Sequence, residues 1–264
     1  CELGEVYNSI EQWDSLSVED FLDGTMISMF YHNDSWMIST RSNIGANCKW
    51  IGKKSFNEMF KEACNLEFSS LDESKFYTFV LMHPDNIIVT QYHVPEIVLV
   101  SVGSVVDGKM VCHDIYKEPL EIKRPIKYSF NNISEIRDFV RTMDFQQQGI
   151  VIKDKENKRV KIRNDNYNYA KSLKGNTNNV KYLYYENKKH KHIQEYLSFF
   201  PNETEMYNKF NSEFIKLVSD TLNYYKKFHI KKSIKIKEIP FQLRPICYDL
   251  HGIYMIRRAR LQFN

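Results

Sequence analysis

Apolar residues change their spacing part-way along this 264-residue chain, and that change limits the folds open to it. Up to about residue 165 they occur in short β-rich runs separated by turn residues, as in antiparallel sheets. Beyond about residue 185 they recur every three or four residues, as along the buried face of a helix. The pattern predicts an α+β protein, in which an antiparallel-sheet domain over residues 1–180 precedes a smaller helical domain over residues 181–264.

Short polar turns between β-rich runs predict three hairpins, and apolar residues on one helical face predict three helices. The hairpins cover residues 25–42, 77–93 and 96–112, with turns at His32–Asp34, Pro84–Asn86 and Asp107–Gly108. The helices cover residues 55–65, 132–143 and 203–228. We expect the apolar stripe of the last helix to be a packing face rather than a ligand site; it consists of Tyr207, Phe210, Phe214, Leu217, Val218, Leu222 and Tyr225.

The cysteines and the hydropathy of the chain limit the compartment, the metal sites and the membrane association that we expect. The five cysteines are scattered and include no C-x-x-C pair, which favours a reducing compartment over a disulfide framework. Cys112 and His113 come nearest to a metal-ligand pair, but neighbours on a strand point to opposite faces, so we expect no metal site. No apolar run approaches a membrane span, and the first residues lack a secretion signal, so we expect a soluble, cytoplasmic protein with no membrane partner. Because the sequence begins at Cys1, we expect a trimmed piece of a longer chain.

Charge is distributed unevenly behind the modest net charge of +4. Residues 1–40 contain acidic residues but no Lys or Arg, whereas basic residues concentrate in the stretches 153–174, 188–191 and 226–237. Such stretches bind the phosphates of nucleic acids, and they also occur as solvated faces. Charge alone therefore leaves RNA binding and a solvated surface as alternatives.

Four stretches of the chain stand in a recognisable order. They read FLDGTMISMF, STRSNIG, FYTFVLMHPDNIIV and QQGIVIKD, the last followed by RVKIRNDNY. Together they resemble the nucleotidyltransferase motifs of the single-strand RNA ligases of phages and large DNA viruses. In that family the first motif is K-x-D-G, the third resembles F-E-L-V-S-P-x-N-R-I-V, the fourth is E-G-I-V-I and the fifth is K-x-K. Near the end, LRPICYDLHGIYM resembles the helical C-terminal region of viral members. The resemblance implies an antiparallel-sheet, ATP-grasp-like nucleotidyltransferase domain.

Residues that the family needs for covalent chemistry are replaced in this chain. The lysine that attacks ATP to form a lysyl-AMP falls at Phe21, which has no nitrogen to form a phosphoramidate, and the first lysine of the chain is Lys49. The motif glutamates fall at Val80 and Gln148, and the arginine of the third motif falls at Ile87. ATP and Mg²⁺ are the family's cofactors, but Mg²⁺ favours carboxylate oxygens. We therefore expect no catalytic residue, no bound metal and no cofactor.

A partial cradle for phosphate and sugar remains at the motif positions. The resemblance implies nucleotide or phosphate contacts for Asp23, Gly24, Arg41, Gln148, Lys161 and Arg163. Gln148 keeps an acceptor and a donor without charge, and Arg163 in place of lysine favours bidentate phosphate contact. The alternative is that Asp23-Gly24 is only a turn and that the two basic residues are exposed on a strand. Candidates to stack on adenine are Tyr77, Phe79 and Tyr92, with strand packing as their alternative.

Taken together, these replacements indicate an RNA-ligase-like module that has lost lysyl-AMP formation. We expect it to act as a pseudoenzyme that binds RNA or a nucleotide, or that takes part in a larger assembly, in the cytoplasm, a viral factory or a virion. Two alternatives stay open. One is an active ATP-dependent RNA ligase, or a ligase limited to sealing RNA ends that arrive already adenylated. The other is a scaffold that binds protein partners and no nucleotide.

Overall fold

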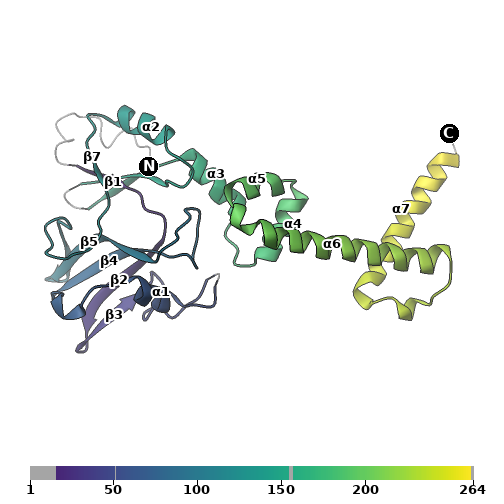
Figure 1. Ribbon diagram of the computed structural model, residues 1–264, viewed down its shortest axis with the longest axis horizontal. Helices are drawn as coiled ribbons and strands as arrows, with labels where there is room; N and C mark the ends of the chain where they lie inside the picture. The colour runs from purple at the N-terminus through teal and green to yellow at the C-terminus, as the bar shows by residue number, and fades with distance from the viewer. Residues whose placement is uncertain (1–15, 51, 155–156, 263–264) are drawn as a thin grey trace. The chain divides into compact units, whose positions relative to one another are not determined.

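The computed structural model describes residues 16–50, 52–154 and 157–262. The chain forms two compact units, Cys1–Leu183 and Tyr184–Asn264, and helix α4 contains the boundary between them. The acidic N-terminal segment predicted from the sequence falls partly on residues 1–15, which lie outside the described residues. The expected α+β class is confirmed, because the first unit contains two antiparallel sheets and the second is helical (Figure 1).

In the described residues of the first unit, nine strands build two sheets. They are β1 Ser17–Asp20, β2 Thr25–His32, β3 Ser35–Ser39, β4 Lys75–Met82, β5 Glu96–Val106, β6 Lys109–His113, β7 Lys127–Tyr128, β8 Gly149–Lys153 and β9 Arg159–Arg163. The smaller sheet has the strand order β7-β1-β8-β9 and the larger one β3-β2-β4-β5-β6. The chain passes from the smaller to the larger sheet through residues 21–24, between β1 and β2.

Seven α-helices complete the described part of the fold. They are α1 Phe56–Ala63, α2 Ile133–Arg141, α3 Asp165–Lys174, α4 Val180–Lys189, α5 Ile193–Phe199, α6 Thr204–Tyr225 and α7 Arg244–Gln262. Short 3-10 helices occupy Phe68–Ser70, Pro201–Glu203, Ile236–Glu238 and Phe241–Leu243, and a π-helix follows α6 at Lys226–Ile230. The predicted helices at 55–65, 132–143 and 203–228 are thereby confirmed as α1, α2 and α6.

The smaller sheet has one apolar face and one polar face, because side chains alternate along a strand. On the apolar face Ile150 and Ile162 pack against Ile136 and Val140 of α2. The opposite face carries polar and charged side chains. It contains Ser17 and Glu19 of β1, Lys153 of β8 and Arg159, Lys161 and Arg163 of β9, and the register places Val151 between Glu19 and Lys161.

The larger sheet packs helix α1 against its inner face. Met59 and Phe60 of α1 contact the core formed by Ile27, Phe79 and Leu99, and Phe60 and Phe79 lie with ring centres 5.7 Å apart. Ser55 begins the helix with a capping box, in which its hydroxyl accepts from Glu58 N while the Glu58 carboxylate accepts from Ser55 N. The cap therefore sets the start of α1 at Phe56.

Two of the three predicted hairpins are confirmed and one is wrong. Residues 25–42 and 96–112 form β2–β3 and β5–β6, and their two-residue turns adopt the positive φ angles that such hairpins require. Residues 77–93 were expected to form a hairpin around Pro84–Asn86, but only β4 forms, and residues 83–95 contain no strand. The amides of Val89 and Thr90 donate to the Asp23 carboxylate, so they are not part of a strand ladder.

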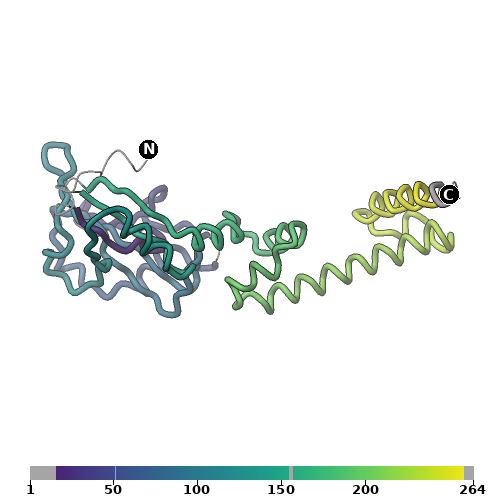
Figure 2. The backbone as a smooth tube through the Cα atoms, turned by 90° about the horizontal axis from the view of Figure 1, so that it is seen from above, coloured from purple at the N-terminus to yellow at the C-terminus, as the bar shows by residue number. Residues whose placement is uncertain are grey.

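The second unit is built on the 22-residue helix α6, which runs as one continuous green helix in Figure 2. Its apolar stripe was expected to be a packing face, and this holds for part of the helix, where Phe210 and Phe214 also contact Tyr184 and Tyr185 of α4. Tyr207 and Tyr225 are buried, whereas Leu217, Val218 and Leu222 are between 41% and 48% exposed. Helical period alone predicts which side chains share a face, but not how much of that face is covered.

The end of α6 and helix α7 share a cluster of rings. His229, on the π-helix, and His251, on α7, stack with ring centres 4.2 Å apart, and Tyr225 lies beside both. Tyr225 Oη, His229 Nε2 and His251 Nδ1 are buried without a hydrogen-bond partner among the described residues. None of the helices in the described part of the chain is both long and apolar enough to span a bilayer.

Candidate functional site

The connector between the two sheets carries the residues of the first motif. Gly24 adopts a φ of 155°, and a Cβ at this position would lie 2.5 Å from the Leu81 carbonyl oxygen and 2.7 Å from Val80 Cγ1. Only glycine allows the connector to pass so close to β4. Phe21 N donates to the Gly149 carbonyl at 2.9 Å, which ties the same connector to β8.

Asp23 is buried, and its hydrogen bonds hold the site together. One carboxylate oxygen accepts from Val89 N and Thr90 N, each at 2.9 Å, and the other accepts from the Tyr167 hydroxyl of α3 at 2.7 Å. The backbone carbonyl of Asp23 accepts from the Tyr92 hydroxyl at 2.6 Å. Burial, and then the Asp23 charge, raises the pKa of both tyrosines, so their hydroxyls remain protonated donors. The Asp23 carboxylate therefore joins the connector, residues 89–90 and helix α3 through its hydrogen bonds.

Gln148 leads into β8 at the position of the fourth motif. It is 8% exposed, and its backbone carbonyl accepts from Asn164 N at 3.1 Å. Its side-chain amide has no hydrogen-bond partner among the described residues and lines a large cavity. Because the amide faces the cavity, a polar ligand there could both donate to it and accept from it. Gln148 therefore has unused donors and acceptors at a cavity wall.

Strand β9 presents three cations on one face, because Arg159, Lys161 and Arg163 alternate along it. Burial, and then the charges of Arg163 and Arg159, lowers the pKa of Lys161; the charges of Arg41 and Lys171 act in the same direction. This mutual repulsion shows that positive charge is concentrated here. An anion placed among these groups would relieve it.

A cavity of about 740 Å³ opens in front of these cations, within the size range of small-molecule sites. Residues from both sheets line it. The expected site residues that line it are Phe21, Asp23, Gly24, Arg41, Val80, Gln148 and Lys161. Arg163 does not line it, although its guanidinium carbon lies 5.7 Å from the centre of the Phe21 ring, and Ile87 does not line it either.

The charges that line the cavity are unbalanced. Arg41, Arg159, Lys161 and Lys171 all line it, and none of them forms an ion pair with a carboxylate in the part of the chain that the structure describes. The acids at the same wall are engaged elsewhere. Glu19 pairs with Lys153, Asp20 accepts from the Tyr128 hydroxyl at 2.7 Å, and Asp23 is bonded as above. The cavity therefore presents unpaired positive charge to whatever enters it.

Phe21 forms part of the cavity wall and leaves the cavity open. The Lys161 ammonium nitrogen lies 4.7 Å from the centre of its ring, in a cation–π contact. The two positions that carry glutamates in the motifs of the resembled family, 80 and 148, carry no charge in this chain. Val80 packs with Met82 and Val98 in an apolar cluster, and Gln148 is uncharged. No group of three or more His, Cys, Asp or Glu side chains suited to a metal ion occurs among the described residues.

A second cavity, of about 300 Å³, shares Glu19, Val100 and Lys153 with the first. Lys153 bonds to Glu19 and donates to the Val100 carbonyl, 3.2 Å away in the other sheet. Val100 is the residue left over where the β4–β5 register shifts, so its carbonyl is free to accept this bond. Burial lowers the pKa of Lys153, and Glu19 opposes that shift.

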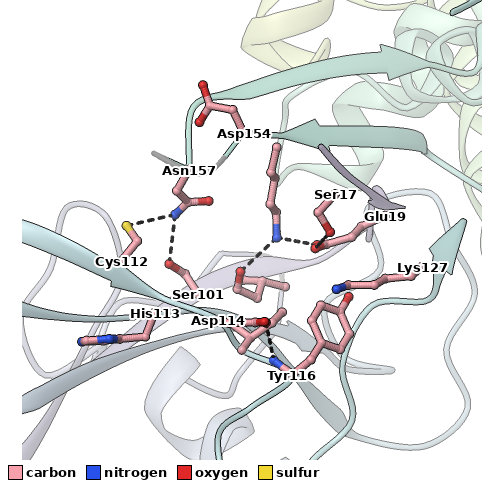
Figure 3. Close-up of a pocket in the computed structure, with 13 residues that line it drawn as sticks. Ser17, Glu19, Ser101, Cys112, His113, Asp114, Tyr116, Lys127, Asp154 and Asn157 are labelled. Carbon is pink, nitrogen blue, oxygen red and sulfur yellow. Dashed lines mark hydrogen bonds and ion pairs between the residues drawn. The ribbon is translucent and has the colours of Figure 1, made fainter. Parts of the chain in front are cut away.

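Figure 3 shows this smaller cavity, with the Asn157 amide directed at Ser101 and Cys112, 3.3 and 3.4 Å away. Its charged groups, which include Glu19, Lys127 and Asp114, are of both signs. It therefore lacks the excess positive charge of the large cavity.

The candidates for adenine stacking do not occupy the cavity. Tyr77 and Phe79 are 1% and 0% exposed in the core beneath α1, and Tyr92 holds the Asp23 carbonyl. For Tyr77 and Phe79 the alternative of strand packing holds, because alternation along β4 turns both to the face that packs on α1. Tyr92 is not among the residues that line the cavity. The aromatic side chains that line the cavity are those of Phe21, Trp50 and Phe56.

Comparison with known proteins agrees with the motifs. A stretch of 97 residues is 31% identical to an RNA ligase of Rhodothermus phage RM378. The resemblance is to RNA ligases. The stretch covers 32% of this chain and 22% of the phage protein, so the chain corresponds to only part of that relative. No protein-family model matches the chain.

Among solved structures, an archaeal ATP-dependent RNA ligase superposes with a TM-score of 0.49 at 14% identity, over 63% of this chain and 47% of its own. A putative ATP-dependent DNA ligase from Aquifex aeolicus gives a TM-score of 0.48 at 16% identity, over 83% of this chain and 64% of its own. Each solved chain is therefore matched over less than two thirds of its length.

Several residues of the cavity were not predicted as site residues. Arg159 and Lys171 were noted only as members of a basic stretch, and Met26 and Trp50 were not noted as candidates. Alternation of Arg159 with Lys161 and Arg163 along one strand is a signal that the sequence contains. No sequence signal indicates that Trp50, in the loop before α1, lines the same cavity.

Proposed function

We propose that the larger cavity binds the phosphates of a nucleotide or of an RNA end, and that it does so without covalent attachment of the nucleotide at residue 21. The observation that carries the proposal is the set of unpaired cations at one cavity wall, Arg41, Arg159, Lys161 and Lys171. Phosphate oxygens are the ligands that Lys and Arg side chains bind most readily in nucleic-acid-binding proteins.

Gln148 adds a second reason to favour a nucleotide over a simple anion. Its unpaired amide offers both donors and acceptors at the cavity wall, which suits the hydroxyls of a ribose or the edge of a base. An anion such as sulfate uses donors only. The proposed ligand therefore combines phosphate with neutral polar groups.

Covalent transfer is not part of the proposal, because Phe21 supplies no amine. Protein carboxylates that could hold Mg²⁺ are also missing at positions 80 and 148, and the nearby Asp23 carboxylate is occupied by three donors. A Mg²⁺ ion in this cavity would be held by the phosphate oxygens of the nucleotide itself.

The test is the salt dependence of binding to a short 5′-phosphorylated single-stranded RNA. The variant Lys161→Gln/Lys171→Gln removes two of the cations that line the cavity and keeps side-chain bulk. If both cations contact phosphates, the slope of log K against log salt falls by about 1.4 in magnitude, since each single-strand contact contributes about 0.7. The matched control is Lys209→Gln/Lys216→Gln on the exposed face of α6, which removes the same charge from the other unit.

Three ligands distinguish a free nucleotide from an RNA end: the RNA with its 5′-phosphate, the same RNA without it, and ATP. Equal binding of the RNA with and without its 5′-phosphate, together with competition by ATP, assigns the cavity to a free nucleotide. Loss of binding without the 5′-phosphate assigns it to an RNA end. If the double variant keeps the wild-type slope, the cavity does not bind phosphate. Sealing of a pre-adenylated RNA by the wild-type protein would replace the proposal with that of a ligase specialised for the last step.

A further inference from the structure

Two large apolar side chains are exposed on the wall of the same cavity that holds the unpaired cations. Trp50 is 44% exposed and Met26 is 40% exposed, and both line the cavity. Exposed apolar surface of this size is unfavourable in water, and inside a concave site it marks a place where a ligand's apolar surface is covered.

The backbone that leads to Trp50 is anchored to helix α1. The carbonyls of Ala46 and Cys48 accept from Asn57 N at 2.8 Å and from Phe56 N at 3.1 Å. Trp50 therefore follows, by two residues, a stretch that is hydrogen-bonded to the first turn of α1.

The cavity lining thus combines two chemistries, a group of cations and two exposed apolar side chains, the Trp50 indole and the Met26 thioether. A ligand that satisfies both must carry negative charge at one end and a planar, weakly polar group at the other. Nucleotides have this composition. Inorganic phosphates lack the planar group, and sugar phosphates do too.

We propose that Trp50, with Met26, forms a nucleobase subsite in this cavity, in which the indole stacks on the base of the bound nucleotide. The inference rests on the proposed function, since it assumes that the phosphates lie against the cations. It places the base at the loop before α1, on a residue outside every motif of the resembled family. Stacking favours all bases, because each has a π face, and the larger purine rings are covered more completely.

Base–aromatic stacking sets the size of the expected effect. Alanine substitution of a stacking aromatic weakens binding by roughly tenfold to a hundredfold. Because inorganic tripolyphosphate carries the phosphates without a base, its affinity measures the cations alone. The difference between ATP and tripolyphosphate therefore measures the base subsite.

The experiment compares ATP and tripolyphosphate binding to the full chain by calorimetry, in four proteins. They are the wild type, Trp50→Ala, Trp50→Phe and the control Phe68→Ala, which removes an aromatic that is 38% exposed outside the cavity. We expect the wild type and the control to bind ATP at least tenfold more tightly than tripolyphosphate. Trp50→Ala abolishes that preference and leaves tripolyphosphate binding unchanged, and Trp50→Phe keeps most of it.

Each other outcome has a definite meaning. Equal wild-type affinities for ATP and tripolyphosphate, or an unchanged ATP preference in Trp50→Ala, overturns the base subsite and leaves phosphate binding intact. Tripolyphosphate binding that is absent, or that survives unchanged in Lys161→Gln/Lys171→Gln, overturns the proposed function and the subsite with it.

Discussion

The ammonium nitrogen of Lys161 lies 4.7 Å from the centre of the Phe21 ring. By motif order, Phe21 stands at the position of the lysine in the resembled RNA ligases. Its ring stabilises the Lys161 cation through its π face, where a lysine would add another positive charge. Under the proposed function, Phe21 supports the cations that bind phosphate and offers no amine for covalent attachment.

Restoring the lysine alone should not restore covalent transfer. In Phe21→Lys the new ammonium would lie close to Lys161 and Arg163, while positions 80 and 148 still lack a carboxylate. We expect no protein-bound label from ATP labelled at the α-phosphorus, and roughly threefold weaker or unchanged non-covalent ATP binding, since the added charge helps phosphate but costs a cation–π contact.

The matched comparison is the triple variant Phe21→Lys/Val80→Glu/Gln148→Glu, which also replaces both acids of the motifs. A label on the triple variant but not on the single one supports the view that the acids were lost together with the nucleophile. Covalent label on Phe21→Lys by itself would show that the acids are dispensable.

The Asp23 carboxylate should matter for stability more than for binding. Asp23→Asn turns an amide NH₂ toward at least one of the three donors, and we expect it to lower the free energy of unfolding by about 2–4 kcal/mol. Tyr167→Phe removes one of those donors and should cost about 1–2 kcal/mol. Urea denaturation measures both, with the exposed Tyr182→Phe as the control, which should stay within about 0.5 kcal/mol of the wild type. A value for Asp23→Asn as small as that of the control would contradict the structural role.

His229 should titrate below its usual range. Burial, and then the neighbouring His251, lowers its pKa from the ordinary value of 6.5. A lowered pKa in the folded state contributes stability that is present above about pH 6.5 and is lost as the pH falls through the folded value. NMR titration of the ring protons should give a midpoint below 6.5, and His251→Gln should raise it. A midpoint at or above 6.5 in the wild type would contradict the packing of the two rings.

Local patterns predicted much of the fold because they depend on neighbours in sequence. The turns at Asn33–Asp34 and Asp107–Gly108 adopt the backbone angles that their residue types favour, and the helical spacing of apolar residues within 55–65 gives the buried face of α1. The order of the motifs likewise indicated that Phe21, Gln148 and Lys161 belong to one site, and all three line the same cavity.

What could not be predicted depends on contacts between distant residues. Residues 87–93 have the composition of a strand, but Asp23, more than sixty positions earlier, accepts from two of their amides. Alternation along β4 showed that Tyr77 and Phe79 share a face, but not which face packs on α1. Trp50 reaches the cavity from a loop, where no periodicity indicates direction.

The central claim is that the cavity binds a nucleotide without attaching it. The most direct measurement divides one sample of protein, Mg²⁺ and α-labelled ATP between equilibrium binding and denaturing electrophoresis. The account predicts saturable binding in the native half, weakened at least tenfold by Lys161→Gln/Lys171→Gln, and no label on the denatured protein. Label that stays on the denatured chain, or no binding in the native half, would contradict it.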